Sequence, residues 1–385
     1  MTRSILLRPI QKDPMPRRLA LILFLLATVT AFAQQHSDQA WRFAVSGDSR
    51  NCGDVVMPAI AQSVKAEHPA FYWHLGDFRA MYDVDEDLQR RYSDKLSLTE
   101  YRQIAWSDFL ENQVRPFDPV PVFLGIGNHE VAFKTPTDFL AAFGYWLDTP
   151  ELHNQRVNEY SVDTSLKTYY HWRERNVDFI YLDNSGDDGF DSDQIQWFEH
   201  LLARDKADSE IKTLVVGMHR ALPNSLACGH SMNGDIGGEH PKSIDSGRRA
   251  YADLVQWRKD TQRFVYVLAS HSHFYMDDIY QTDYWKNHAE VLPGWIVGTA
   301  GAKRYRLPEL PSDVLTQHNA QTKVWGYLLA TVAPSGEIKF EFKKLGVSDV
   351  PDSVRKLYGD FVESVCDKGN VDFGKHDPPP SCFDK

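Results

Sequence analysis

The sequence of 385 residues is short of cysteine and of positive charge. Its four cysteines include no CxxC pair, so a zinc site built on paired cysteines is not expected. There are 42 Lys and Arg residues against 53 Asp and Glu, a formal charge of −11. That balance argues against binding to nucleic-acid polymers, which depends on basic side chains that neutralise phosphates. No internal repeat is present, and with 42% hydrophobic and 25% charged residues the composition is typical of a globular protein.

The N-terminal region lacks a hydrophobic run long enough for a confident membrane span. Arg17 and Arg18 precede an apolar stretch over residues 19–33, which ends in Ala-Phe-Ala. Basic residues, a short apolar core and small residues at its end are typical of a secretory signal peptide. We therefore predict a signal peptide over 1–33, a secreted or periplasmic protein, and no stable membrane span after cleavage. The alternative is an N-terminal membrane anchor.

The four cysteines fit export to an oxidising compartment, where disulfides form. Cys366 and Cys382 lie close together in a tail rich in Pro and Gly, so they are the first expected pair. Cys52 and Cys228 are then the second pair, and free buried thiols are the alternative.

Apolar runs predicted to be strands alternate with helical stretches. In the first half the predicted elements are strands at 41–46, 70–75 and 121–126, and a helix over 55–67. In the second half they are a hairpin of 169–174 with 177–182, a helix over 193–204, and strands at 214–217, 264–269, 294–299, 324–332 and 337–343. This alternation predicts an α/β fold with a parallel or mixed sheet covered by helices. In such sheets ligands bind beyond the carboxyl ends of the strands.

Two further segments stand apart from these elements. Residues 220–247 are rich in Gly, Asn, Ser and His and are predicted to form a long loop, which in a compact domain is often functional. The main domain is expected over 34–346. Residues 347–385 are expected to form a peripheral polar tail.

A set of carboxylate, amide and imidazole side chains falls at or just after the predicted strand ends: Asp48, Asp77, Asn128, His129, His219, His271 and His273. These are ligand types for Fe, Mn and Zn. On a regular strand, residues two apart share a face, so His271 and His273 are expected to reach one metal cluster. Two nearby metals suit phosphoryl transfer, in which a histidine can protonate the leaving group.

Each of these residues has a simpler explanation when taken alone. Asp48 or Asp77 could cap a helix, and His74, inside an apolar run, is expected to be a packed histidine rather than a ligand. Caps do not, however, require a Gly-Asn-His-Glu sequence followed by two further strands that end in histidine. The ordered set therefore favours a metal centre.

The ordered blocks resemble the calcineurin-like metallophosphoesterases, which include the purple acid phosphatases. The blocks that carry the resemblance lie within residues 41–300 and are Gly47-Asp48-Ser49-Arg50, Gly76-Asp77, Gly127-Asn128-His129-Glu130, Gly217-Met218-His219 and Ser270-His271-Ser272-His273. The resemblance implies two mixed β-sheets packed as a sandwich and flanked by helices. It also implies a metal-dependent phosphoesterase that hydrolyses small phosphate mono- or diesters with one or two transition-metal ions (Fe, Mn or Zn). Together with the predicted signal peptide, this predicts an exported enzyme.

The resemblance also implies a role for each site residue. Asp48 and His273 would hold one metal, Asp77 would bridge, and Asn128, His219 and His271 would hold the second. His129 would be the catalytic acid or transition-state stabiliser, and Glu130 would orient it.

The first block departs from the family pattern, which is usually Asp-x-His. Arg50 stands at the histidine position, and Ala80 stands where purple acid phosphatases have a tyrosine ligand. We expect Arg50 to bind substrate phosphate, because a guanidinium can hold phosphate oxygens in a bidentate manner. A surface or salt-bridged Arg50 is the alternative. The missing ligand could be replaced by Tyr82, Asn51 or water, or the first site could simply be weak.

Two other functions fit parts of the pattern. Gly47-Asp48-Ser49 resembles the first block of the GDSL esterases, which makes a metal-free esterase with Ser49 as nucleophile one alternative. No convincing Asp-x-x-His follows near the C-terminus to support it. The other alternative is a degenerate metal-binding protein without turnover, which Arg50 would favour.

Overall fold

The computed structural model describes residues 39–159, 164–227, 230–234, 240–308 and 319–372. The chain divides into two units, Met1–Ala40 and Trp41–Lys385, and the description below concerns the second. The predicted signal peptide, Cys228 and Cys382 lie outside the described residues. Within the described residues, no helix combines the length and apolar character needed to cross a bilayer.

A five-stranded sheet has the order β12-β11-β1-β2-β3. Its strands are β1 (Trp41–Ser46), β2 (Tyr72–His74), β3 (Val122–Leu124), β11 (Trp325–Val332) and β12 (Ile338–Leu345). β1, β2 and β3 are parallel, whereas β11 and β12 are antiparallel to their neighbours. The three parallel strands therefore deliver the residues that follow them to one edge of the sheet.

A seven-stranded sheet has the order β10-β8-β9-β7-β6-β5-β4. Its strands are β4 (Tyr170–Glu174), β5 (Val177–Leu182), β6 (Thr213–Met218), β7 (Phe264–Ala269), β8 (Tyr275–Met276), β9 (Gly294–Val297) and β10 (Ala320–Gln321). β5, β6, β7 and β9 are parallel and form the centre. Both sheets are mixed.

The two sheets pack face to face through a core rich in aromatic side chains. Phe43 of β1 and Phe71, directly before β2, stack with 5.3 Å between their ring centroids. Phe179 of β5 in the larger sheet meets both rings edge-on. Aromatic pairs prefer offset-stacked or edge-to-face geometry, and they add stabilisation beyond area burial. The predicted sandwich of two mixed sheets is therefore confirmed.

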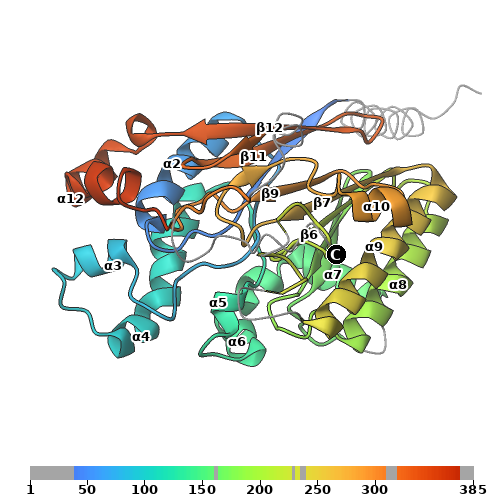
Figure 1. Ribbon diagram of the computed structural model, residues 1–385, viewed down its shortest axis with the longest axis horizontal. Helices are drawn as coiled ribbons and strands as arrows, with labels where there is room; N and C mark the ends of the chain where they lie inside the picture. The colour runs from blue at the N-terminus through green and yellow to red at the C-terminus, as the bar shows by residue number, and fades with distance from the viewer. Residues whose placement is uncertain (1–38, 160–163, 228–229, 235–239, 309–318, 373–385) are drawn as a thin grey trace, which may run out of the picture. The chain divides into compact units, whose positions relative to one another are not determined.

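Helices cover the outer face of each sheet (Figure 1). α8 (Ser192–Ala207), α9 (Pro241–Thr261) and α10 (Asp283–His288) share a buried cluster with β5, β6 and β7. α2 (Gly53–Ala66) and α12 (Asp352–Tyr358) pack with β1 and β11. The order of layers is helix, sheet, sheet, helix, as the sequence resemblance implies.

Further helices lie between β2 and β3 and between β3 and β4. They are α3 (Glu86–Arg91), α4 (Leu98–Phe109), the π-helix η1 (Leu110–Val114), the 3-10 helix η2 (Arg115–Phe117), α5 (Asn128–Val131), α6 (Pro136–Leu147) and α7 (Pro150–Glu159). Between them lies a buried group of four carboxylates around one arginine, which we name the Arg79 cluster: Arg79 with Asp54, Asp85, Asp87 and Asp108.

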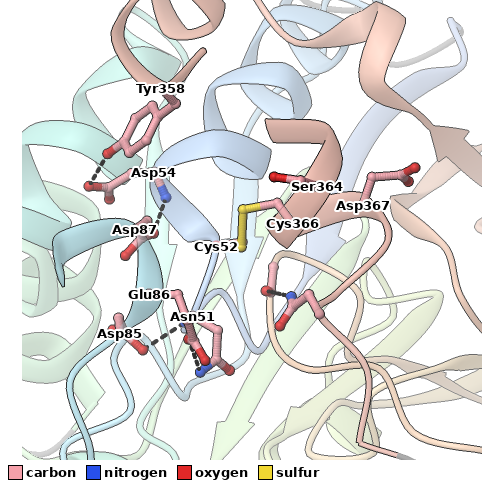
Figure 2. Close-up of a disulfide and its surroundings, with 12 residues drawn as sticks. Asn51, Cys52, Asp54, Asp85, Glu86, Asp87, Tyr358, Ser364, Cys366 and Asp367 are labelled. Carbon is pink, nitrogen blue, oxygen red and sulfur yellow. Dashed lines mark hydrogen bonds between the residues drawn. A yellow bond between two sulfur atoms is a disulfide. The ribbon is translucent and has the colours of Figure 1, made fainter. Parts of the chain in front are cut away.

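The C-terminal segment corrects the expectation of a peripheral tail for residues 347–372. The 3-10 helix η4 (Val347–Asp349), α12 and the π-helix η5 (Val362–Asp367) place Tyr358 and Val362 in the core cluster beside α2. The described disulfide joins Cys52 to Cys366 with an S–S distance of 2.06 Å, so the expected pairings of these two cysteines were wrong (Figure 2). Packing of η5 against α2 brings together two cysteines that are distant in sequence.

Two local expectations also change. The long loop predicted over 220–247 ends early, because α9 begins at Pro241. Proline is favoured in the first turn of a helix, where its missing N–H costs no hydrogen bond. His271 and His273 lie beyond the end of β7 and not on a strand, so their shared strand face is also a wrong expectation.

Candidate metal centre

The predicted ligand residues converge at the carboxyl ends of parallel strands from both sheets. Asp48, Asp77 and Asn128 follow β1, β2 and β3, and the histidines follow β6 and β7. Two backbone hydrogen bonds join the loops that carry Asp48 and Asp77. Asp48 N donates to the Gly76 carbonyl and Ser49 N donates to the Asp77 carbonyl, both at 3.0 Å. The two loops therefore act as one platform.

One set of possible metal ligands, here the first group, consists of Asp48, Asp77 and His273. Its ligand atoms all lie within 4.8 Å of one another, and all three residues are buried. His273 Nε2 lies 3.2 Å from Asp48 Oδ1.

A second set, here the second group, consists of Asp77, His219 and His271, also with ligand atoms within 4.8 Å. His219 Nε2 lies 3.2 Å from Asp77 Oδ1 and 3.1 Å from His271 Nδ1. Asn128 Oδ1 is 3.0 Å from the same nitrogen. Asp77 belongs to both groups, which is the arrangement expected of a carboxylate that bridges two ions.

Three of these residues adopt the left-handed backbone conformation. The φ angles are 62° at Asp48, 59° at Asp77 and 65° at His271. Non-glycine residues rarely adopt this conformation, and backbone strain of this kind clusters at functional sites. At His271 the left-handed turn replaces the strand geometry that the sequence suggested. His271 thereby reaches the second group while His273 reaches the first.

Each bridging or flanking carboxylate has one oxygen fixed by the backbone. Asp48 Oδ2 accepts from His271 N at 2.7 Å, and Asp77 Oδ1 accepts from His129 N at 3.0 Å. The other oxygens, Asp48 Oδ1 and Asp77 Oδ2, are buried and accept no hydrogen bond from the described residues. A buried carboxylate oxygen without a donor is costly unless a positive charge is nearby, so both oxygens fit a position next to a cation.

Hydrogen bonds to Nδ1, the nitrogen that faces away from the second group, orient the imidazole of His219. Its Nδ1 lies 2.9 Å from the Leu75 carbonyl and 3.0 Å from Ser270 Oγ, which is itself 3.0 Å from the same carbonyl. With Nδ1 donating to the carbonyl, Nε2 faces the second group, as in metal sites where the distal nitrogen fixes the tautomer. Gly47 leaves room for Ser270, because a Cβ there would lie 2.6 Å from Ser270 Cβ.

The charge of His219 reflects this environment. Burial alone would lower the pKa of His219, but the carboxylates of Asp77 and Asp48 raise it to about 9. Asn128 Oδ1, Asp77 Oδ1 and His271 Nδ1 all crowd one nitrogen, and a cation in their midst would satisfy them. The donor set therefore fits a transition-metal ion.

His129 and Glu130 follow Asn128 in α5 and have separate surroundings. His129 Nε2 lies 3.7 Å from Asp77 Oδ2, while Nδ1 lies against the Ala80 carbonyl. Burial and then Arg50 lower the pKa of His129 to about 3. The Glu130 carboxylate accepts from Asp77 N, Phe78 N and Gly127 N, each at 2.8 Å. The described partner that orients the ring is thus Ala80, and Glu130 clamps the two loops.

Arg50 lies inside the first group. Its Nη2 is 3.0 Å from His273 Nε2, and its Nε is 3.9 Å from Asp77 Oδ2. Nη2 also donates to the Tyr305 hydroxyl at 3.2 Å, and the Tyr305 ring stacks on His273 at 3.9 Å between centroids. A surface position for Arg50 does not hold, because only 15% of its side chain is exposed, whereas the salt-bridged alternative fits its ion pair with Asp77.

Tyr305 is a site residue that sequence reasoning missed. It follows β9 by several residues in an irregular segment, so neither a strand end nor a motif marked it. Burial raises its pKa well above the usual range. Its contacts with Arg50 and His273 make Tyr305 a neighbour of the first group.

The candidates for a replacement ligand in the first group lie elsewhere. The Tyr82 ring meets that of His129 edge-on at 4.7 Å between centroids. Asn51 Nδ2 donates to Glu86, and Asn51 Oδ1 accepts from Lys303 N. Both side chains are therefore used outside the first group.

The two simpler explanations, caps and a packed histidine, have definite outcomes. The N-cap of α2 is Cys52 and not Asp48. His74 is a buried, packed histidine as expected, since its Nδ1 accepts from Gly76 N at 3.2 Å and burial lowers its pKa to about 3. Ser49 Oγ donates to the Phe78 carbonyl at 3.4 Å, a backbone partner rather than the imidazole that a serine nucleophile requires.

A cavity of about 140 Å³ opens over the site. Arg50, His129, Tyr82 and Lys303 contribute to its wall. A larger cavity of about 260 Å³ lies near α7, β4 and α8, with Trp197 and His200 on its wall, and none of the predicted site residues line it. The smaller cavity is the one that fits the chemistry, since it contains the converging ionisable groups.

The fold is shared with known phosphatases. The described fold is similar to that of a purple acid phosphatase from yellow lupin seeds, with 18% identity and a TM-score of 0.52 over 80% of this chain and 52% of that one. This chain thus spans about half the length of that protein. Weaker likenesses are to PhoD (14% identity, TM-score 0.46, 87% and 73% of the two chains) and to a phosphatase from Mycoplasma pneumoniae (11%, 0.36, 84% and 98%). No protein-family model and no curated protein sequence matches the chain. The metallophosphoesterase resemblance is therefore supported at the level of fold.

Proposed function

We propose that this chain is an exported, metal-dependent phosphoesterase that hydrolyses small phosphate mono- or diesters. One observation carries the proposal: two buried groups of candidate metal-ligand side chains share Asp77. The shared fold with a purple acid phosphatase supports it.

In this proposal the second group and Asn128 hold a transition-metal ion, and Asp48 and His273 belong to the first site. Nitrogen and oxygen ligands of this kind suit Fe, Mn or Zn. When bound, such ions lower the pKa of water and offset negative charge on a phosphoryl group.

Two residues of the chain would act on the substrate directly. The Arg50 guanidinium lines the small cavity, where its N–H groups can donate to phosphate oxygens. His129 would protonate the leaving alkoxide. Because its pKa is low, its Nε2 must first take up a proton, which the negative charge of a bound phosphoryl group favours.

Two features of the chain support a small substrate and export of the protein. The cavity of about 140 Å³ suits a phosphoryl group with a small attached group rather than a polymer. The described disulfide fits an oxidising compartment and so supports the predicted signal peptide.

The test is metal-dependent hydrolysis of an aryl phosphate and an aryl phosphodiester by the purified protein. Chelation should abolish turnover, and added Mn²⁺, Zn²⁺ or Fe²⁺ should restore it. His219→Ala should release the metal and lower kcat/KM by more than a hundredfold, since even residues that only orient a ligand are worth 10–100-fold. His200→Ala, at an exposed position, is the matched control.

Other outcomes separate the alternatives. Loss of esterase activity in Ser49→Ala, with no effect of chelation, would favour the serine esterase. Bound metal without turnover of either ester class would favour the degenerate binding protein and would contradict the proposed catalysis.

A further inference from the structure

We infer that this chain binds one metal ion, in the second group, because the guanidinium of Arg50 takes the place of an ion in the first group. The inference rests on the proposed metal-dependent function and adds the stoichiometry of the centre. Arg50 is then a permanent cation at the position where the calcineurin-like metallophosphoesterases, which this sequence resembles, usually have a histidine ligand.

The lone pair of His273 is the first piece of evidence. His273 Nδ1 lies 2.6 Å from the Lys303 carbonyl, so Nδ1 carries the proton and Nε2 carries the lone pair. Arg50 Nη2 lies 3.0 Å from that Nε2 and, as a guanidinium nitrogen, can only donate. The nitrogen that would bind an ion already accepts a hydrogen bond.

The carboxylates of the first group supply the second piece. Asp77 Oδ2 lies 3.9 Å from Arg50 Nε, and Asp48 Oδ1 lies 3.2 Å from the His273 nitrogen that Arg50 contacts. An ion bonded to these atoms at about 2.0–2.2 Å would stand beside the guanidinium. Two positive charges at that separation in a buried site repel each other, and Arg50 cannot lose its proton to relieve the repulsion.

The backbone around Arg50 keeps the side chain in place. On one side, Ser49 N is bonded to the Asp77 carbonyl. On the other side, Asn51 N donates to Asp85 Oδ1 at 2.7 Å, and Cys52 is cross-linked to Cys366 (Figure 2). These contacts fix the backbone at Arg50, and an incoming ion could displace the guanidinium only by breaking its hydrogen bonds to Tyr305 and His273.

The second group offers a different environment. The atoms around His219 Nε2 are Asn128 Oδ1, Asp77 Oδ1 and His271 Nδ1, at 3.0–3.2 Å. The four side chains here are an amide, a carboxylate and two imidazoles, and none is a guanidinium. The single ion is therefore expected in this group.

Metal stoichiometry tests the inference directly. The full-length protein is loaded with excess Mn²⁺ or Zn²⁺, freed of unbound ion by gel filtration and measured by elemental analysis. We expect one ion per wild-type chain and two per Arg50→His chain. Arg50→Gln, which removes the charge but adds no imidazole, should bind a second ion more weakly. Arg42→His, at an exposed ion pair with Glu67, is the control and should bind one.

Two further measurements locate the ion without relying on activity. His219→Ala should lose the wild-type ion, whereas His273→Ala should retain it. The electron paramagnetic resonance spectrum of the Mn²⁺-loaded wild type should be that of an isolated ion, and that of Arg50→His should show coupling between two ions.

Each contrary outcome is decisive. Two ions per wild-type chain would overturn this inference and leave the proposed function standing, as would one ion lost in His273→Ala but kept in His219→Ala. A single ion in wild type, Arg50→His and Arg50→Gln alike would also overturn it, because Arg50 would not be what excludes the second. No bound ion in the loaded wild type would overturn the proposed function itself.

Discussion

Two buried acidic regions of this molecule arise from the same two loops but are neutralised in different ways. The loop after β1 provides Asp48 to the candidate metal centre and leads to Asp54 of the Arg79 cluster. The loop after β2 provides Asp77 to the centre and Arg79 to the cluster. In the cluster, the guanidinium contacts all four carboxylates. In the centre, two carboxylate oxygens lack a described hydrogen-bond donor.

The difference shows what separates a structural acidic cluster from a candidate binding site. Arg79 is fully buried and hydrogen-bonded by the chain itself. Gln113 and Tyr358 both donate to Asp54, and Figure 2 shows the Tyr358 contact. The centre instead surrounds its carboxylates with imidazoles, which offer lone pairs. Arg50 makes the centre intermediate between the two, because one half contains a guanidinium and the other does not.

Removal of Arg79 should produce the largest effect. Arg79→Met leaves four buried carboxylates without their central cation, and breaking a buried ion pair costs about 3–5 kcal/mol. We expect the free energy of unfolding to fall by about that amount, measured by urea denaturation of metal-free protein.

The matched control is Arg91→Met. Arg91 contacts Asp54 and Asp108 from a side chain that is 27% exposed, so its loss should cost about 1 kcal/mol or less. Equal destabilisation by the two substitutions would contradict the view that Arg79 neutralises the cluster.

The next largest effect should be a pH-dependent change in stability when Asp108 of the Arg79 cluster is replaced. Burial raises the pKa of Asp108 to about 6, although Arg79 and Arg91 act to lower it. Between the unfolded value, about 3.9, and 6, the folded state holds a proton that the unfolded state has released, so this group's contribution to stability falls as pH rises. Asp108→Asn removes that contribution.

Relative to wild type, Asp108→Asn should therefore gain stability as pH rises from 4 to 6, by at most about 1.4 kcal/mol per pH unit. Urea denaturation of both proteins at pH 4, 5, 6 and 7 measures the difference. A difference that stays constant across this range would show that Asp108 titrates normally.

The smallest effect should come from the residue behind His219. Ser270→Ala removes one of two oxygens near His219 Nδ1 and leaves the Leu75 carbonyl. We expect metal affinity to fall about tenfold, the low end for residues that orient a ligand, in a competition assay with a chromophoric chelator.

Ser272→Ala is the control for that change. Its hydroxyl lies in the same loop but donates to the His230 carbonyl at 3.4 Å. Its affinity for metal should stay within about twofold of wild type. If Ser272→Ala weakened binding as much as Ser270→Ala, the loop conformation and not the His219 contact would be responsible.

Local pattern was enough to predict the strands that carry the site. The apolar runs 41–46 and 264–269 coincide with β1 and β7, and the predicted hairpin is β4 with β5. Three site loops begin where an apolar run meets a Gly-polar step, at Gly47, Gly76 and Gly127, so these strand ends could be found without knowledge of pairing. Parallel pairing then brings those ends together.

Contacts between distant segments could not be predicted in this way. Cys366 and Tyr305 reach the site loops only after the C-terminal segment and the segment after β9 have packed, and no local signal marks either residue. The left-handed turn at His271 likewise depends on the bond from its N–H to Asp48, a residue on another strand end. The clamp role of Glu130 depends on two loops that meet only in the folded chain.

The cross-link between Cys52 and Cys366 closes almost the whole described domain into a covalent ring. A single proteolytic nick anywhere within that ring leaves the two fragments attached to each other. On a denaturing gel, a nicked sample would keep the mass of the intact chain until a reductant is added, so the integrity of any preparation should be judged under reducing conditions.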